Sequence, residues 1–258
     1  MEKRKNRSME IERKNFQGVL NILSFNRHFY VIGILVLFLI ITLCFYFDVP
    51  KILIWIISGA FLYGLLMPLI ISAYVYDFSG YYDFKWFKDL QIIDSDKTQI
   101  VNINAGFDET SFTIKDKFSK SNLQVFDFYN ADEHTEPAII RARKISNQYL
   151  NTKQINTNYI PLNDNAVDVI FLLSAIHEIR KDDEKILFLK ECKRICKQNG
   201  KVIIVEHLRD VPNFFAFSVG FAHFFSQKTW MNVFKKAGFT SISERKFTSF
   251  MSIFTLEK

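Results

Sequence analysis

The sequence predicts an α/β domain with a doubly wound, mostly parallel, seven-stranded sheet, preceded by a transmembrane α-hairpin. Two uncharged apolar runs lie near the N-terminus, at residues 29–47 and 52–76. From about residue 98 onward, short apolar segments alternate with helical patterns, which is typical of doubly wound sheets. Residues 167–173 are apolar almost throughout, as expected for a central parallel strand that is covered on both faces.

The two apolar runs have the length of membrane-spanning helices. Residues 29–47 would form about 28 Å of helix at ~1.5 Å per residue, close to the ~30 Å hydrocarbon core of a bilayer. Residues 52–76 are long enough to span with some tilt. The polar turn at 48–51 makes the pair an antiparallel hairpin. A secretory signal peptide fits poorly, because a second apolar run follows at once, and the alternative is a buried hairpin in a soluble protein.

Charge predicts the orientation of this hairpin. Residues 1–28 contain seven Lys or Arg against three Glu, within a net charge of +6 for all 258 residues. Such a basic head beside a span is expected to face anionic lipid, and we expect no nucleic-acid partner. The positive-inside tendency places the N-terminus and everything after residue 77 in the cytosol, as a multi-pass protein of the cytoplasmic membrane. Residues 77–97 mix aromatic rings with charges, which predicts a linker in the headgroup zone.

The soluble domain is expected to cover residues 98–258. Its predicted strands are residues 100–103, 123–126, 154–157, 167–173, 201–206, 240–246 and 251–257. One helix is expected to run from residue 182 to Asn199-Gly200, with Cys192 and Cys196 on its apolar face. A second covers 227–237 and is stopped by Gly238. The cysteines lack a second pair, so neither a zinc site nor a disulfide framework is indicated.

Five collinear segments carry a family resemblance, and they span about residues 98–258. The first three are the strand and loop at 100–106, the acidic Asp127 after the second strand, and the segment 160–170, which begins Ile160-Pro-Leu. The other two are the helix-turn-strand at 190–206 and the segment 234–239, which ends in Ala-Gly-Phe. In this order they resemble class I S-adenosylmethionine (SAM) methyltransferases, nearest the small-molecule type that includes ubiquinone and menaquinone methyltransferases. The resemblance implies a Rossmann-like methyltransferase fold with SAM as cofactor.

The resemblance also implies which residues bind the cofactor. The family's Asp-x-Gly-x-Gly loop reads Asn102-x-Asn104-x-Gly106 here, and asparagine tolerates a left-handed backbone better than other non-glycine residues. Asp127 stands where the family has a carboxylate that accepts both ribose hydroxyls; otherwise it is an acid at a strand end. Asn156 falls where a residue faces the adenine, or is an ordinary loop asparagine. Because the loop has lost glycines and its acid, a non-catalytic SAM-fold binding or scaffold protein is the alternative function.

Two histidines follow the strands that border the expected substrate crevice. His177 and Glu178 come after residues 167–173, and His207 ends the strand at 201–206. We assign these three as catalytic, with a histidine as the general base that deprotonates a phenol, enol or carbon acid. The same groups could bind a divalent metal or form a structural hydrogen-bond cluster. We expect no resident metal.

The aromatic stretch at 211–225 indicates the kind of substrate. It lies after the strand at 201–206, where this fold often builds a substrate lid, and it is too interrupted to span a membrane. Many rings beside a crevice favour a greasy substrate or contact with the bilayer, although a core helix would look similar. The sequence therefore predicts a methyltransferase that acts on a lipophilic small molecule, such as a phenol, quinone precursor, polyene or lipid. A nicotinamide-dependent oxidoreductase is disfavoured, since Gly-x-Gly-x-x-Gly is absent.

Overall fold

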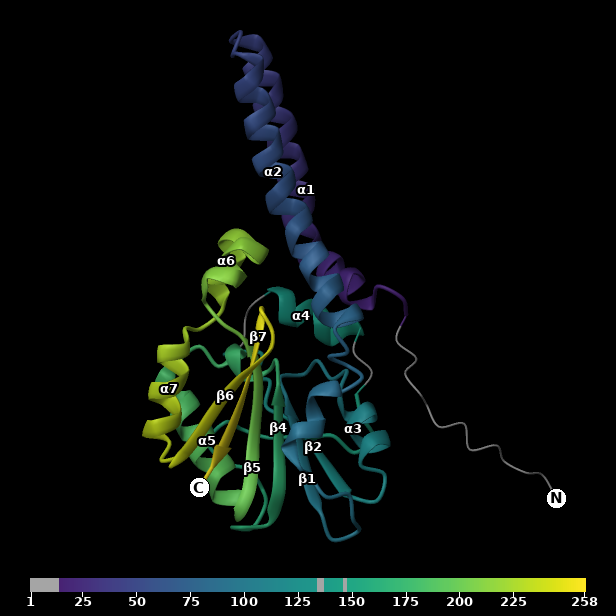
Figure 1. Cartoon of the computed structure of the whole chain (residues 1–258), viewed down its shortest axis with the longest axis vertical. Helices are drawn as coiled ribbons and strands as arrows, with labels where there is room; N and C mark the ends of the chain where they lie inside the picture. The colour runs from purple at the N-terminus through teal and green to yellow at the C-terminus, as the bar shows by residue number, and fades with distance from the viewer. Residues whose placement is uncertain (1–13, 134–136, 146–147) are drawn as a thin grey trace, which may run out of the picture.

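The structure, a computed structural model, describes residues 14–133, 137–145 and 148–258, so the first half of the predicted basic head lies outside the described residues. The chain forms a seven-stranded sheet in the order β3-β2-β1-β4-β5-β7-β6 (Figure 1). Strands β1 to β5 are mutually parallel, and β7 runs antiparallel to both β5 and β6. The predicted fold class, a doubly wound, mostly parallel sheet of the methyltransferase type, is confirmed.

The elements have the following bounds. The strands are β1 Gln99–Asn104, β2 Asn122–Asp127, β3 Lys153–Gln154, β4 Val167–Leu173, β5 Cys196–His207, β6 Ser241–Thr248 and β7 Met251–Glu257. The α-helices are α1 Gln17–Tyr46, α2 Lys51–Ser72, α3 Ser111–Lys117, α4 Pro137–Ile145, α5 Asp182–Ile195, α6 Val211–Phe217 and α7 Gln227–Lys236. Shorter turns are the π-helix η1 Ala73–Phe78 and the 3-10 helices η2 Lys85–Leu90, η3 Ile176–Glu178 and η4 Ser218–His223.

Both faces of the sheet are covered, and side chains alternate between them as a strand requires. Ile170 and Leu172 of β4 pack into the cluster formed with α5 and α7, whereas Val169 and Phe171 face the opposite cluster. Helix α3 lies on this second side (Figure 1). The strand order turns back between β1 and β4, because the chain leaves β1 for β2 and β3 before it returns to β4. Open α/β sheets bind ligands at the carboxyl ends of the strands at such a switch point.

The aromatic linker differs from the sequence prediction. Its rings were expected in the headgroup zone, but they are buried against the second face of the sheet: Tyr81, Phe84, Trp86 and Phe87 are at most 5% exposed. Phe87 stacks on Phe171 of β4 with ring centroids 5.0 Å apart. The prediction was wrong for these rings because this sheet face is apolar, and the linker covers it together with α3.

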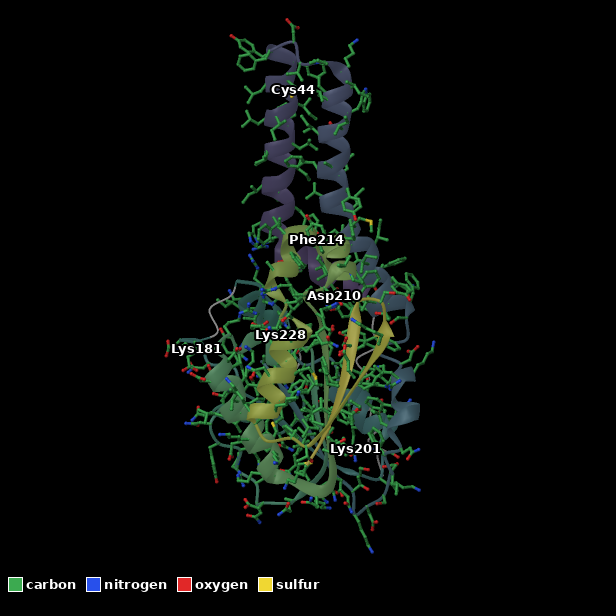
Figure 2. All side chains as sticks on the ribbon, turned by 60° about the vertical axis from the view of Figure 1, so that its left-hand side comes forward. Cys44, Lys181, Lys201, Asp210, Phe214 and Lys228 are labelled. Carbon is green, nitrogen blue, oxygen red and sulfur yellow. The ribbon has the colours of Figure 1, made fainter. Side chains whose placement is uncertain are left out.

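The helical hairpin extends from the carboxyl edge of the sheet (Figure 1). Helix α1 and the continuous helical segment Lys51–Phe78 are both long and apolar enough to cross a membrane, by length and composition. Little of either helix is buried, and apolar side chains cover its surface, including Phe38 and Trp55 (Figure 2). Helix α1 begins at Gln17, well before the predicted residue 29. Its first turns contact η1, where the Gly18 amide donates to Asp77 Oδ1 over 2.9 Å, and reach the soluble domain, where Asn21 Nδ2 donates to Glu109 Oε1.

The start of β5 also differs from the prediction. Asn199-Gly200 was expected to end the preceding helix, but α5 ends at Ile195, and Cys196 and Gly200 lie in β5. Cys196 pairs with Val167 of β4, and the register shifts between Val167 and Val169. Gly200 is needed at this irregularity for close approach rather than as a helix stop. A Cβ there would lie 2.9 Å from the Asp168 carbonyl oxygen and 2.7 Å from Cys196 Sγ.

We therefore expect Gly200→Ala to destabilise the protein. The added methyl group meets backbone oxygens that cannot move away, and overpacking of this kind costs about 1–3 kcal/mol. The midpoint of thermal unfolding, followed by circular dichroism on the full chain in detergent, should fall by several degrees. Gly220→Ala is the matched control, because the nearest atom to a Cβ at that position is Phe217 Cβ at 3.8 Å. Equal midpoints for the two variants would contradict the packing argument.

Candidate active site

The loop after β1 is held by asparagine side chains. Asn102 is buried, and its Nδ2 donates to Thr110 Oγ1 over 3.1 Å and to Ser111 Oγ over 2.8 Å, at the start of α3. Asn104 Oδ1 accepts from the Gly106 amide over 2.8 Å. Gly106 itself has φ +85°. The left-handed position is thus Gly106 and not Asn104, which stays in the extended strand and supports the turn through its side chain.

Asp127 ends β2 next to this loop and is buried, with its side chain 2% exposed. Its Oδ1 accepts from the Tyr129 amide over 2.8 Å, and its Oδ2 forms an ion pair with Arg143 Nη1 at 2.8 Å. The Arg143 guanidinium also lies over the Tyr129 ring, 4.1 Å from its centroid, and fills the space that a Cβ at Gly106 would occupy. A ribose that bonded both oxygens of Asp127 would therefore have to displace Arg143.

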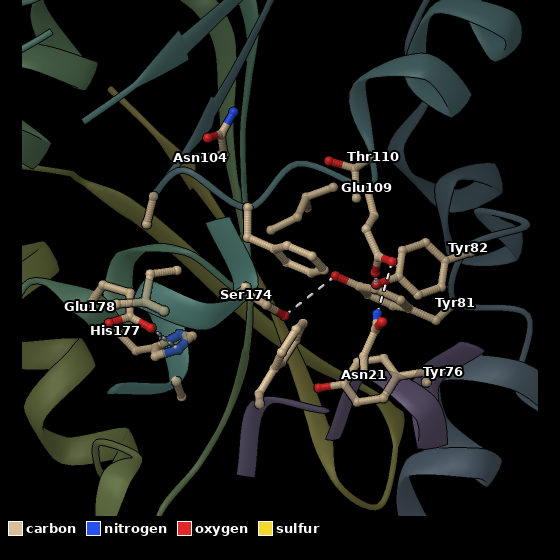
Figure 3. Close-up of a pocket in the computed structure, with 18 of the residues that line it drawn as sticks. Asn21, Tyr76, Tyr81, Tyr82, Asn104, Glu109, Thr110, Ser174, His177 and Glu178 are labelled. Carbon is tan, nitrogen blue, oxygen red and sulfur yellow. Dashed lines mark hydrogen bonds and ion pairs between the residues drawn. The ribbon is translucent and has the colours of Figure 1, made fainter. Parts of the chain in front are cut away.

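A cavity of about 190 Å³ opens at the carboxyl ends of β1 and β4, at the switch point of the sheet (Figure 3). Asn102 and Asn104 line it from β1, and His177 and Glu178 from η3. Within the described chain, Asn104 Nδ2 is buried and has no hydrogen-bond partner. The cavity brings these four predicted residues together. Gly106, Asp127, Asn156 and His207 lie outside its lining, and Asn156 is exposed in a turn closed by Tyr159.

The opposite wall of the cavity comes from residues that the sequence analysis missed. Asn21 of α1 donates to Glu109 Oε1 over 2.9 Å, and Tyr82 donates to Glu109 Oε2 over 2.5 Å. Tyr76 and Tyr81 complete this wall (Figure 3). The Tyr81 hydroxyl lies 3.4 Å from Ser174 Oγ, directly after β4. The run of tyrosines at 76–82 was visible in the sequence, but its pairing with Glu109 and with α1 depends on the tertiary fold.

His177 is enclosed by carboxylates. Its Nδ1 donates to Glu206 Oε2 over 2.7 Å, its amide donates to Glu206 Oε1 over 3.3 Å, and its Nε2 lies 3.4 Å from Glu178 Oε1. Burial alone would lower the pKa of His177. The charges of Glu206 and Glu178 and the hydrogen bonds to them outweigh burial and raise the pKa to about 10. At neutral pH this imidazole is therefore protonated on both nitrogens and positively charged. It can stabilise an anion, but it cannot accept a proton.

His207 has the opposite environment. Its Nδ1 lies 2.9 Å from the Phe250 carbonyl oxygen, which can only accept, so Nδ1 carries the proton. Its Nε2 then accepts from the Tyr76 hydroxyl over 2.8 Å. Burial lowers the pKa of His207 to about 4, although the hydrogen bonds to Phe250 and Asn213 oppose this. The neutral ring lies behind Tyr76 and reaches the cavity only through that tyrosine.

Comparison with a family model identifies the central part of the domain. Residues 121–204, from just before β2 into β5, match the model of a methyltransferase domain. This match supports a SAM-dependent methyltransferase domain of class I, with SAM as its cofactor. No curated protein matches the chain.

Solved structures with similar folds include several methyltransferases. A SAM-dependent methyltransferase from Aquifex aeolicus matches with 18% identity and a TM-score of 0.46, over 70% of this chain and 93% of its own. One from Methanosarcina mazei matches with 12% identity and a TM-score of 0.45, over 66% and 95%. Human N-acetylserotonin methyltransferase, in complex with SAM, matches with 13% identity and a TM-score of 0.49, over 76% and 55%. The fold assignment rests on the strand order rather than on these distant likenesses.

The raised pKa of His177 predicts how stability depends on pH. Its folded-state pKa of about 10 exceeds the unfolded value near 6.5, so its contribution is complete below pH 6.5 and is lost as the pH rises toward 10. Between pH 7 and 9 the free energy of unfolding should fall by about 2 kcal/mol from this group. Thermal unfolding at a series of pH values measures the slope. His177→Gln should flatten it, whereas His207→Gln should leave it unchanged; a retained slope in His177→Gln would contradict the assignment.

Proposed function

We propose that this chain is a membrane-anchored, SAM-dependent methyltransferase that acts on a lipophilic small molecule. The observation that carries the proposal is the shared wall of the cavity. One side is the carboxyl edge of a methyltransferase-type sheet, and the other is the base of the apolar hairpin, with Gly18, Ile22 and Phe25 of α1. Within this cavity a substrate would touch both the catalytic edge and the helices that enter the membrane.

Exposed apolar surface supports a membrane location. The hairpin helices carry apolar side chains that nothing in the described chain covers, whereas a core helix of a soluble protein would be mostly buried. Helix α6 continues this surface at the base of the hairpin, with Phe214 46% and Phe215 58% exposed (Figure 2). The Tyr63 hydroxyl of α2 donates to the Phe215 carbonyl over 2.7 Å, which joins the two elements. Such continuous apolar patches favour burial in lipid.

The residues at the switch point fit SAM if Arg143 moves. Gly106 supplies the left-handed turn that allows a close backbone approach, and Asp127 presents a buried carboxylate at the end of β2. Asn104 Nδ2 adds a donor that has no partner in the described chain. When bound, SAM supplies an electrophilic methyl group on a sulfonium. An acceptor hydroxyl in the cavity would take up this methyl group and release its proton to solvent.

The carboxylate-bound His177 suggests how the acceptor is activated. A protonated imidazole at the cavity wall stabilises an oxyanion more than the neutral hydroxyl. We propose that His177 lowers the pKa of the acceptor hydroxyl electrostatically. Glu206 orients the ring and holds its second proton on Nδ1. His207 acts at a distance, since its Nε2 fixes the hydroxyl of Tyr76.

The alternative of a non-catalytic scaffold has one observation in its favour. The Arg143–Asp127 ion pair satisfies the carboxylate that SAM would need, and the loop retains one glycine of the family pattern. A scaffold would keep this ion pair permanently, whereas an enzyme must open it for every cofactor molecule. Affinity for SAM therefore separates the two functions.

Asp127→Ala should abolish SAM binding by the full chain in detergent, measured by isothermal titration calorimetry. Two charge-assisted hydrogen bonds disappear, each worth roughly 1.5–3 kcal/mol. Arg143→Ala should instead tighten binding by about 10-fold, because the cofactor no longer has to break the ion pair. Arg141→Ala removes an equal charge from the same helix, and it should bind as the wild type does. Undetectable binding by both the wild type and Arg143→Ala would favour the scaffold.

The membrane orientation predicts a labelling pattern in intact cells. Lys51 begins α2 directly after the turn of the hairpin, and Lys97 lies between the hairpin and β1. An impermeant maleimide should label Lys51→Cys from outside and should label Lys97→Cys only after the membrane is opened. Labelling of the native cysteines should be low, because Cys44, Cys192 and Cys196 are buried. The reverse pattern would refute the orientation, and equal labelling of both sites in intact cells would refute the span.

A further inference from the structure

Three potential metal ligands meet beside the cavity. His177, Glu178 and His223 each direct one ligand atom into the same space, with all three atoms within 4.8 Å of one another. The two imidazole rings meet edge to face, with centroids 5.1 Å apart. His177 and Glu178 come from η3 after β4, and His223 ends η4 after β5, so the cluster joins two segments at the carboxyl edge of the sheet.

Arginines fix the backbone that carries these ligands. Arg180 Nη1 donates to the His177 carbonyl over 3.1 Å and to the His223 carbonyl over 2.8 Å, and so ties the two segments together. Arg209 holds the residues on either side of His223, since it donates to the carbonyls of Ala222 and Phe224 over 2.7 Å each. Three successive carbonyls at 222–224 are therefore restrained. This is more support than an exposed surface histidine needs, and it positions the imidazole of His223 next to His177.

Glu206 supplies the outer contact that metal-binding histidines usually have. A ligating imidazole commonly donates its other N–H to a carboxylate, which fixes both the ring orientation and the tautomer. Here His177 Nδ1 donates to the buried Glu206 at 2.7 Å, so Nε2 is the nitrogen directed at Glu178 and His223. Two carboxylates thus face one imidazole, and they would partly neutralise a cation bound at Nε2.

We propose that His177 Nε2, the Glu178 carboxylate and His223 form a binding site for a divalent transition-metal ion. Two imidazoles and one carboxylate are ligands that suit Zn²⁺, Mn²⁺ or Fe²⁺ and leave coordination positions open. Bonds of ~2.0–2.2 Å bring donor atoms to within ~3–3.6 Å of one another, so the side chains close slightly around the ion. The ion takes the place of the Nε2 proton, which is released to solvent. This assignment departs from the sequence expectation of no metal.

The metal ion would activate the acceptor oxygen of the methyl transfer. This role rests on the proposed function. His177 and Glu178 line the cavity, so an open coordination position can face an acceptor oxygen bound there. A coordinated hydroxyl loses its proton more readily, because the ion stabilises the oxyanion. The substrate class becomes narrower: a lipophilic molecule with a phenolic, enolic or adjacent carbonyl oxygen.

Metal binding by the full, untagged chain in detergent tests the site directly. After treatment with a chelator and dialysis, calorimetric titration with Zn²⁺ and with Mn²⁺ should show one saturable site per chain. His223→Gln should weaken that site at least ~10-fold, since one of three ligands is lost. Glu206→Gln should weaken it ~10–100-fold through the orientation of His177. His28→Gln removes a histidine that contacts Arg141 outside the cluster, and it should bind as the wild type does.

The outcomes separate this inference from the proposed function. Thermal unfolding without metal checks that His223→Gln is folded, and added Zn²⁺ should raise the midpoint of the wild type but not of this variant. No saturable binding by the wild type, or equal affinities in the wild type and His223→Gln, would overturn the metal site. SAM binding, titrated separately, decides the methyltransferase assignment. Metal binding without SAM binding would refute the methyltransferase assignment and would still support the metal site.

Discussion

The need to cover both faces of β4 determines how the rest of the molecule is arranged. Its side chains are apolar on both sides, and Phe171 would be exposed if only α5 and α7 packed on the sheet. The segment that stacks on Phe171 is η2, through Phe87, and a turn of six residues joins it to η1 and α2. The sheet therefore holds the base of the hairpin as part of its own core. Because this base also forms a wall of the cavity, the packing that completes the domain also completes the candidate active site.

The sequence predicted those elements whose signal is local. The apolar run of β4, the two apolar runs of the hairpin and the stop of α7 at Gly238, with φ +91°, all come from neighbouring residues. The fate of the linker rings was not predictable in this way, because a segment of mixed rings and charges suits a headgroup zone and a sheet face equally well. The predicted end of the helix at Gly200 was wrong for a similar reason. The spacing of Cys192 and Cys196 suits a helix, but Cys196 pairs with β4 and lies in a strand.

The candidate site was predictable only where residues end strands. Asn104, Asp127 and His177 follow strands that the sequence identified, and the structure places all three at the carboxyl edge. The sequence did not indicate a role for Arg143, because its partner Asp127 lies 16 residues earlier, before a loop and the first turns of a helix. His177 and His207 looked alike, each near acidic residues. Tertiary contacts separate them: carboxylates surround the first, whereas a carbonyl and a tyrosine hydroxyl hold the second as a neutral ring.

The segment α6–η4 connects the hairpin to both histidines. Tyr63 of α2 bonds the backbone of α6 at Phe215, η4 ends at His223, and Phe224 stacks on His207 at 4.9 Å. A displacement of the hairpin relative to the sheet would therefore change the spacing of His223 and His177 and the wall that His207 supports through Tyr76. If the hairpin lies in a bilayer, as proposed, the membrane holds this segment in place. The geometry of the acceptor site then depends on the environment from which a lipophilic substrate arrives.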